Sequence, residues 1–260
     1  MQADPPSDLR RQLADLMQEQ RALIDGLRGG QAYFRQLARS VWRVQEDERR
    51  RIANELHDGV GHNLAALIHL VANARAALQA AGDPCLPALH ALERAHAIAE
   101  STLQDTRALS RLLRPQILDD LGLEAAMHWL ARSSLETRGL DVRLAFRAPT
   151  APLDGDRATL VFRVAQEALA NAARHAGATR VDVRFDGHAD RVRLEVRDDG
   201  RGCDLATALA RGSTGASAGL GGMRDRARLF DGSLHLDSAP GAGFTLVLEL
   251  PIDDPAAGPA

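Results

Sequence analysis

The stretch from Glu48 to Leu67 constrains this chain most, because it has the pattern of an amphipathic helix with a histidine beside its apolar face. The apolar residues of the stripe recur every three or four positions: Ile52, Leu56, Val60, Leu64, Leu67 and Val71. At about 100° per residue, His57 lies roughly 70° from the centre of the stripe and Asp58 lies nearly opposite it. We therefore expect the His57 ring to face water, mostly neutral, and to act as a nucleophile if a base holds its other nitrogen. From this stretch alone, an ordinary solvated histidine on a bundle helix is the alternative.

Composition and charge are those of an ordinary soluble globular protein. The 260 residues are 45% apolar and 26% charged, and the formal net charge of −3 gives no overall attraction to nucleic acid or anionic lipid. The two cysteines, Cys85 and Cys203, lie far apart in the chain, which favours a reducing compartment. No apolar run is long enough to span a bilayer, and the first residues show no signal pattern. We expect a cytoplasmic protein that has no membrane span and binds no nucleic acid directly.

Residues 1–45 have the spacing of a short coiled coil. The apolar positions alternate in steps of four and three, with Gln20 in the single gap: Leu9, Leu13, Leu16, Leu23 and Leu27. Gly29 and Gly30 are predicted to interrupt this helix, and a second seam begins near Tyr33 or Phe34 and continues to Val44. We interpret the segment as a dimerising or signal-relaying helix, with a solubilising extension as the alternative.

Residues 46–114 are predicted to form a helical hairpin. The first helix should continue to about Ala80, because the segment Ala81–Pro84 has the glycine and proline of a helix stop. The second helix should run from Leu86 or Pro87 to Leu113. Two helices have too little core to be stable alone, so we expect two hairpins to pair as a homodimeric four-helix bundle.

Residues 115–251 are predicted to form an α+β domain with a mostly antiparallel sheet, followed by a disordered tail, 252–260. Helical periodicity continues from about Leu118 to Arg138, and Asp141–Ala145 alternates as a strand does. The later predicted helices and strands are Asp156–His175, Arg180–Phe185, Arg191–Val196, Met223–Phe230, Ser233–Ser238 and Phe244–Leu250.

Three segments of this domain carry groups that suit a nucleotide. In the first, Glu167 and Asn171 lie four residues apart, opposite the apolar stripe of their helix. Together with Arg174 and His175 they could hold a hydrated Mg²⁺ and its phosphates. An ordinary solvated helix face is the alternative.

In the second segment Asp198 precedes two glycines, Gly200 and Gly202. A carboxylate can accept a hydrogen bond from an exocyclic amine, and glycines let the backbone approach a ring closely. A plain turn is the alternative.

In the third segment Gly219, Gly221 and Gly222 precede a predicted helix, whose free N–H groups suit a phosphate chain. The run of small residues before them, Ala206–Ala218, is predicted to be mobile, as a lid is.

In this order and spacing, the three segments resemble the N, G1 and G2 boxes of the ATPase domain shared by histidine kinases, gyrase and heat-shock chaperones. Two further sequences, E-L-H-D-G-V-G-H around His57 and L-R-P-Q-I-L-D-D-L-G-L before the ATPase domain, are similar to those of sensor histidine kinases of the nitrate-sensor type. The resemblance covers about Val41 to Pro251. It implies a two-layer α+β sandwich after the helical bundle.

The resemblance also implies a reaction. In that family the histidine at the position of His57 takes the γ-phosphoryl group of ATP and passes it to an aspartate of a response regulator, here expected to carry a helix-turn-helix DNA-binding domain. Asp58 would orient or deprotonate the ring, Asn171 would hold Mg²⁺, and Glu167 would position a Mg²⁺-bound water or aid the transfer. Asp198 would bind the adenine amine. The remaining contacts with the base, the phosphates or the lid would come from Arg174, His175, Gly200, Gly202, Gly219, Gly221 and Gly222.

The chain departs from the family pattern at two positions. Five residues after His57, much of the subgroup has a glutamine that places the water which dephosphorylates the regulator, whereas this chain has His62. A histidine can also hold a water, so phosphatase activity is still expected. Thr245 is displaced by one position from the usual Gly-Thr and should point to the other face of its strand, so it is not predicted to be a ligand.

Two other functions remain open from the sequence. One is a nucleotide-gated scaffold that acts mainly as a regulator phosphatase or phosphate sink. The other is an anti-sigma-factor-like serine kinase, against which the Glu48–Leu67 helix argues, because that class has no phosphoacceptor helix. The sequence does not indicate the input signal, the identity of the regulator, or whether phosphate moves within a protomer or between protomers.

Overall fold

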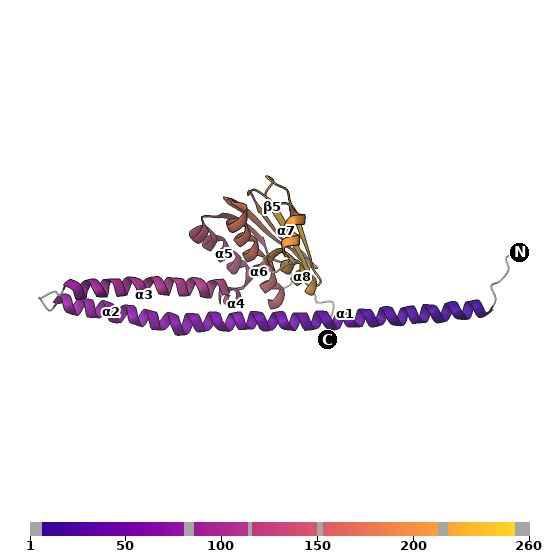
Figure 1. The fold of residues 1–260 in the computed structure, drawn as a ribbon, viewed down its shortest axis with the longest axis horizontal. Helices are drawn as coiled ribbons and strands as arrows, with labels where there is room; N and C mark the ends of the chain where they lie inside the picture. The colour runs from indigo at the N-terminus through magenta and orange to yellow at the C-terminus, as the bar shows by residue number, and fades with distance from the viewer. Residues whose placement is uncertain (1–6, 81–85, 114–115, 150–152, 213–217, 253–260) are drawn as a thin grey trace. The chain divides into compact units, whose positions relative to one another are not determined.

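The computed structural model describes residues 7–80, 86–113, 116–149, 153–212 and 218–252, so residues 253–260 of the predicted tail lie outside it. The chain divides into two units, Met1–Val44 and Gln45–Ala260. The first helices are α1 (Ser7–Glu55), the π-helical turn η1 (Leu56–Gly61), α2 (His62–Ala80) and α3 (Leu86–Leu113) (Figure 1).

In the N-terminal unit, α1 passes through Gly29 and Gly30 without a break, so the predicted interruption there is wrong. A glycine inside a helix costs about 1 kcal/mol relative to alanine, which lowers helix stability without ending the helix. Leu23 and Leu27 of the predicted seam are exposed in the single chain, at 67% and 62%. The coiled coil therefore stays a prediction.

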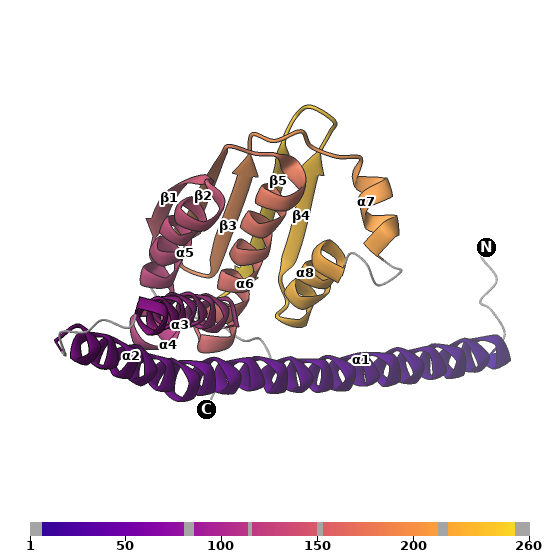
Figure 2. The same ribbon diagram turned by 60° about the vertical axis from the view of Figure 1, so that its left-hand side comes forward.

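The predicted hairpin is confirmed, because α2 and α3 pack side by side in both views (Figures 1 and 2). Its turn, residues 81–85, lies outside the described residues. No described residue of α2 is buried within the single chain. Among the helices that the structure describes, none is long and apolar enough to cross a membrane.

The turn η1 separates α1 from α2, where the sequence predicted one continuous α-helix. A π turn accommodates one extra residue in a helix and occurs frequently at functional sites. Gly59 and Gly61 lie in this turn, and their low helix propensity makes the regular α-helix less favourable there. Val60 of the predicted apolar stripe is 42% exposed in the single chain, and Leu67 is 46% exposed, so burial of this stripe in a dimer stays a prediction.

The second half of the larger unit contains one five-stranded sheet in the order β1-β2-β3-β5-β4. Only the β1–β2 pair is parallel, which confirms the mostly antiparallel sheet. Thr245 pairs with Arg197, whose side chain is exposed, and so lies on the outer face as predicted. The strands are β1 (Asp141–Arg147), β2 (Arg180–Gly187), β3 (Arg191–Asp198), β4 (Ser233–Ser238) and β5 (Phe244–Pro251).

Helices cover one face of this sheet (Figure 2). They are α5 (Gly122–Arg138), which packs on β1, α6 (Gly155–Asn171), which packs on β3 and β5, and α8 (Ala218–Leu229), which packs on β4 and β5; the short α4 (Gln116–Asp120) precedes α5. Along β2 the inward residues Val181, Val183 and Phe185 are buried, whereas Asp182 and Arg184 between them are exposed. The domain is therefore the expected two-layer α+β sandwich, with a charged outer face.

The helix that carries Glu167 begins at a cap, because the Asp154 side chain accepts the Arg157 backbone N–H at 2.9 Å. It was predicted as one α-helix to His175. Instead, α6 passes into a π-helical turn, η2 (Ala172–Ala176), which ends at Gly177 in the left-handed conformation, φ 61°.

The glycine-rich region is more helical than predicted. The helix α7 (Leu205–Gly212) occupies much of the run that was expected to be mobile, and the mobility of these residues stays a prediction. Residues 213–217 lie outside the described part of the chain. Because α8 begins at Ala218, Gly219, Gly221 and Gly222 lie within its first turns and not ahead of it.

Candidate functional site

Glu167 and Asn171 lie one helical turn apart near the end of α6, and both are half-buried. Leu160 and Val164 on the opposite face of α6 are buried in the core and fix the orientation of the helix. The start of α8 approaches the pair closely, since a Cβ on Gly219 would lie 2.6 Å from Glu167 Oε1 and 3.9 Å from Asn171 Nδ2. A side chain at this position would force the Glu167 carboxylate to move. The first and third segments therefore meet in space.

Asp198 is the last residue of β3 and is 8% exposed. Its Oδ1 accepts the backbone N–H of Gly200 at 2.9 Å and that of Phe244 at 3.2 Å. Burial raises the pKa of the Asp198 carboxyl group, and the two hydrogen bonds oppose this effect. Among the described residues, none donates a hydrogen bond to Oδ2, so this oxygen can accept one from a ligand.

The neighbouring Asp199 has a structural role. Its carboxylate accepts the backbone N–H groups of Arg180 at 3.0 Å and Thr179 at 2.9 Å, and the Thr179 hydroxyl at 2.8 Å. These bonds lower the pKa of the Asp199 carboxyl group, and the bond from Arg180 has the largest effect. Asp199 therefore ties the end of β3 to the start of β2, which leaves Asp198 as the acid available to a ligand.

The loop after Asp198 packs against the end of η2. A Cβ on Gly200 would lie 2.5 Å from the Cβ of Ala176, and the Arg201 N–H donates to the Ala176 carbonyl at 2.9 Å. Gly202 has φ 62°, and a Cβ there would lie 2.1 Å from the carbonyl oxygen of Ala239. Both positions require glycine. Because η2 continues directly from Asn171, the second segment joins the other two at the end of α6.

The glycines inside α8 differ in their surroundings. A Cβ on Gly221 would meet nothing within 4 Å, whereas one on Gly222 would lie 3.1 Å from Nη2 of Arg226. Arg226 is half-buried; burial and the charge of Arg49 lower its pKa, and Glu167 opposes them. Sequence reasoning missed this guanidinium, although its place one helical turn after Gly222 is a usable signal.

Arg174 and His175 lie in η2 and are exposed. A second missed residue, Arg138 at the end of α5, lies near them, because burial and then the charge of Arg174 lower the pKa of Arg138 while Glu167 opposes this shift. No sequence signal indicated Arg138, which belongs to a different helix. Arg138 and Arg226 thus each carry a guanidinium whose charge interacts with that of Glu167.

Mg²⁺ fits the oxygen donors of this site. Among the described residues, no three His, Cys, Asp or Glu side chains gather as a metal cluster. Mg²⁺ bound together with a nucleotide needs fewer protein ligands, because phosphates and waters complete its shell. The amide oxygen of Asn171 and the carboxylate of Glu167 are suitable donors.

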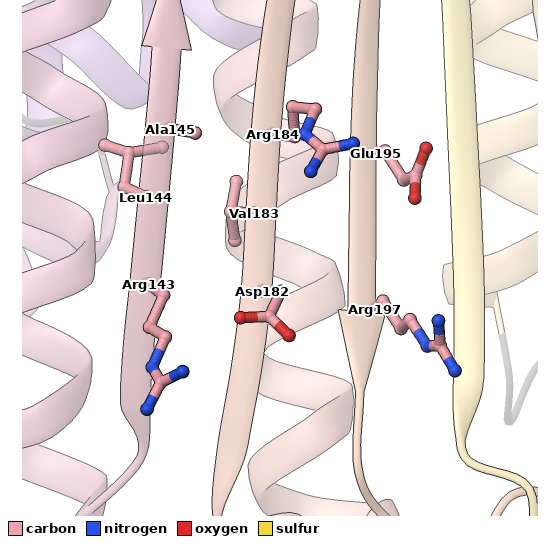
Figure 3. Close-up of a pocket in the computed structure, with 8 residues that line it drawn as sticks. All are labelled: Arg143, Leu144, Ala145, Asp182, Val183, Arg184, Glu195 and Arg197. Atoms are coloured by element: carbon pink, nitrogen blue, oxygen red, sulfur yellow. The ribbon is translucent and has the colours of Figure 1, made fainter.

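Two hollows of the described residues lie on the sheet, one away from this cluster and one beside its second segment. One of about 340 Å³ is on the outer face of β1, β2 and β3, where Arg143, Asp182 and Arg197 follow one another in register with alternating charge (Figure 3). Neither hollow is lined by Glu167 or Gly219. The second hollow does include Asp198 and Gly200 of the second segment. The other hollow, of about 420 Å³, is lined by Arg180, Asp182, Arg197, Asp198, Asp199, Gly200, Gly241, Ala242 and Gly243.

The predicted phosphoacceptor, His57, is the second residue of η1, and its side chain lies outside the described part of the structure. Asp58 is exposed. His62 begins α2 and is also exposed, with Nδ1 2.7 Å from the carbonyl oxygen of Asp58. Because a carbonyl only accepts, the His62 Nδ1–H donates this bond, and Nε2 is left as an acceptor.

These features define a class of protein in which an ATPase domain follows a helical hairpin that carries a histidine. Residues 48–118 match a family described as histidine kinase, and residues 155–254 match a family described as histidine kinase-, DNA gyrase B-, and HSP90-like ATPase. The chain belongs to the sensor histidine kinases, which confirms the resemblance seen in the sequence.

Two curated relatives are similar over most of the chain. The sensor histidine kinase MctS of Rhizobium johnstonii is 35% identical over 216 residues, which are 83% of this chain and 45% of MctS. The oxygen sensor histidine kinase NreB of Staphylococcus carnosus is 33% identical over 224 residues, which are 85% of this chain and 61% of NreB. The chain thus spans about half the length of these relatives.

Two solved structures are also similar. The ATP-binding domain of PrrB from Mycobacterium tuberculosis is 26% identical, with a TM-score of 0.39 over 49% of this chain and 92% of that domain. The histidine kinase domain of the blue-light activated kinase EL346 from Erythrobacter litoralis is 18% identical, with a TM-score of 0.43 over 80% of this chain and 94% of that one. Because both TM-scores are low, the two-layer architecture rests on this chain's own strand order and helix packing.

Proposed function

We propose that this protein is an ATP-dependent protein-histidine kinase that phosphorylates its own His57 and passes the phosphoryl group to an aspartate of a response regulator. The observation that carries the proposal is the approach of Gly219 to Glu167 and Asn171, in a chain that also has the phosphoacceptor hairpin. This approach brings Gly219, one of the proposed phosphate-binding glycines, next to the proposed Mg²⁺ ligand and an acid.

In the proposed reaction, a ring nitrogen of His57 attacks the γ-phosphorus of ATP. The bond from that phosphorus to the β,γ-bridging oxygen breaks, and ADP leaves. Asp58 orients the ring or takes its N–H proton, so the attacking nitrogen keeps a lone pair. Asn171 would hold Mg²⁺, which would neutralise charge on the phosphates, and Glu167 would position a Mg²⁺-bound water or aid the transfer. Phosphoryl transfer needs mainly positioning and charge neutralisation, which this set of residues supplies.

The nucleotide contacts follow from the placement of the other site residues. Oδ2 of Asp198 is the proposed acceptor for the adenine amine, because its partner Oδ1 is already bonded to the backbone. Gly200 and Gly202 shape the base pocket. The proposed phosphate contacts are Gly219, Gly221, Gly222, Arg174 and His175, with Arg138 and Arg226 adding positive charge nearby.

The proposal includes a homodimer. No described residue of α2 is buried in the single chain, and Leu67, Leu70 and Ile98 of the hairpin are 46%, 66% and 67% exposed. A second hairpin would cover these side chains and complete a four-helix bundle. We propose residues 46–114 as this dimerisation and phosphotransfer hairpin and 115–251 as the ATP-binding domain.

The proposed partner is a cytoplasmic response regulator with a helix-turn-helix output domain. The kinase itself has a net charge of −3 and would not contact DNA. Signalling would therefore depend on phosphotransfer to the regulator. Incubation of a purified regulator with the phosphorylated kinase tests this step, with loss of label from His57 and gain on the regulator as the expected result.

Autophosphorylation is the decisive test. The protein incubated with Mg-ATP should gain acid-labile, base-stable phosphate, and His57→Gln should gain none. Omission of Mg²⁺ should abolish the reaction. Equal labelling of the two proteins, or acid-stable label on serine, would refute the kinase proposal and favour the serine-kinase alternative.

A second function, phosphatase activity or a phosphate sink, is favoured by one observation at His62. Its Nδ1–H is bonded to the Asp58 carbonyl, which leaves Nε2 to hold a water. This second function predicts that the protein with nucleotide accelerates loss of phosphate from the regulator and that His62→Ala loses this effect but keeps autophosphorylation. An unchanged dephosphorylation rate in His62→Ala would contradict it.

A further inference from the structure

The buried seam of α3 contains two hydroxyl groups. Ala99, Leu103, Thr106 and Ser110 are each 8% exposed or less and lie on one face of the helix. A buried hydroxyl is costly unless it is hydrogen-bonded. Thr106 bonds within its own helix, to the Thr102 carbonyl at 2.8 Å. The hydroxyl of Ser110 instead donates across the hairpin to the carbonyl of Ala53 at 2.9 Å.

The position of this acceptor relates it to the phosphoacceptor. Ala53 lies four residues before His57, so its carbonyl is the one that the His57 N–H bonds in an α-helix. A carbonyl can accept two hydrogen bonds, so the Ser110 hydroxyl does not have to replace the helical one. Ala53 is itself 1% exposed. The bond therefore fixes α3 to the helical turn that leads into η1.

The other end of η1 also rests on α3. A Cβ on Gly61 would lie 4.0 Å from Cδ1 of Leu103. Leu103 and Ser110 are seven positions apart on α3, whereas Ala53 and Gly61 are eight positions apart on the facing chain. A π turn accommodates one such extra residue. The exposure of Val60, 42%, agrees with this shift, because an unbroken heptad counted from Ala53 would bury position 60 and not position 61.

We propose that Ser110 is a positioning residue for the phosphoacceptor: its bond to Ala53, with Leu103 against Gly61, holds the π turn that sets the direction of His57. One extra residue rotates later side chains by about 100° relative to an unbroken helix. The place of the extra residue therefore determines which side chain faces the nucleotide. Without the Ser110 bond the extra residue can shift along the helix, and His57 loses its fixed direction. This inference rests on the proposed kinase function.

The test compares Ser110→Ala with Thr106→Val, a matched control that removes a buried hydroxyl from the same seam but no bond across the hairpin. Ser110→Ala should lower the maximal rate of His57 phosphorylation by about 10- to 100-fold, the scale of a small misplacement of a reacting group. The ATP concentration at half-maximal rate should not change, because the nucleotide site is untouched. Thr106→Val should keep the wild-type rate. Ser110→Thr, which keeps the hydroxyl, should restore most of the rate.

A second measurement separates this inference from the kinase proposal. Hydrogen exchange of the amides of residues 56–61 in the full-length protein should accelerate in Ser110→Ala and not in Thr106→Val, whether or not the protein is active. Equal rates and equal exchange in the two variants would overturn the role of Ser110. Wild-type protein that gains no phosphate on His57 would overturn the kinase proposal instead, and the exchange data would then still decide whether Ser110 holds the π turn.

Discussion

Replacement of Arg163 or Glu46 by methionine should strongly destabilise the protein, whereas replacement of both should not. Arg163 lies on α6, and Glu46 lies on the part of α1 that leads to η1. The Glu46 Oε2 accepts from Nε and Nη2 of Arg163 at 3.0 and 2.7 Å, and the two side chains are only 4% and 6% exposed. Oε1 of Glu46 accepts from Arg49 at 2.7 Å, and Nη1 of Arg163 donates to Gln166 at 2.9 Å.

The size of the effect follows from which charge is left buried. Loss of one partner of a buried ion pair costs about 3 to 5 kcal/mol, mainly because the other charge stays desolvated. Arg163→Met should fall near the lower value, since Glu46 keeps Arg49 as a cationic partner. Glu46→Met should fall within the same range, because the Arg163 guanidinium loses a carboxylate oxygen that accepts two of its N–H groups. The double methionine variant removes both charges, and such replacements are often neutral.

Urea unfolding at one fixed protein concentration measures these differences, and the double-mutant cycle gives the coupling energy. We expect a coupling of about 3 kcal/mol or more, which reflects the penalty for leaving one charge alone. Additive effects, with the double variant as unstable as the sum of the single ones, would refute the reasoning. That result would mean that α1 and α6 do not form this contact in solution.

Two further predictions concern the nucleotide site, and a third concerns stability at low pH. Asp198→Asn should weaken ATP binding by about 10- to 100-fold, the range for a hydrogen bond to a charged group, as measured by calorimetry. Because burial raises the pKa of Asp198, wild-type affinity should fall on acidification at a higher pH than for an ordinary aspartate, and the asparagine variant should lack this dependence. Gly219→Val should also weaken ATP binding, since its Cβ would lie 2.6 Å from Glu167 Oε1, whereas Gly221→Ala, in open space, should not; equal losses would contradict the site. The pKa of Asp199 is lower in the folded protein than in the unfolded chain. Its carboxylate therefore stabilises the fold at a pH above the unfolded-state pKa, and this stabilisation is lost as the pH falls through the folded-state pKa. Asp199→Asn should flatten the acid side of the plot of melting temperature against pH.

The sequence by itself predicted most helices and strands, because their apolar periodicity is a local property of the chain. The α3 boundaries, Leu86–Leu113, and the strands β4 and β5 follow from that periodicity and from nearby turn residues. The residue types of the three nucleotide segments also indicated their chemistry, since few other side chains suit Mg²⁺, adenine and phosphate in that order.

Local patterns were insufficient where two backbone conformations differ by little free energy. Gly29 and Gly30 weaken α1 by about 1 kcal/mol each, and only the structure shows that the helix continues. The π turn η1 is a comparable case, because periodicity alone favours an unbroken helix through His57. Its position depends on contacts with Ser110 and Leu103, which are about fifty and forty residues away in the chain.

Only the tertiary structure determines which site residues are available to a ligand and which are bonded within the protein. Asp198 and Asp199 are adjacent and chemically identical. Hydrogen bonds from Thr179 and Arg180 hold the Asp199 carboxylate, whereas the Asp198 carboxylate is buried and keeps one oxygen available to a ligand. Burial lowers the pKa of Arg138 and of Arg226, which belong to separate helices, and the charge of Glu167 acts on each to oppose this shift. Sequence determines which groups a chain possesses. Their desolvation and their partners depend on distances through space, which only the packing of α5, α6 and α8 on the sheet sets.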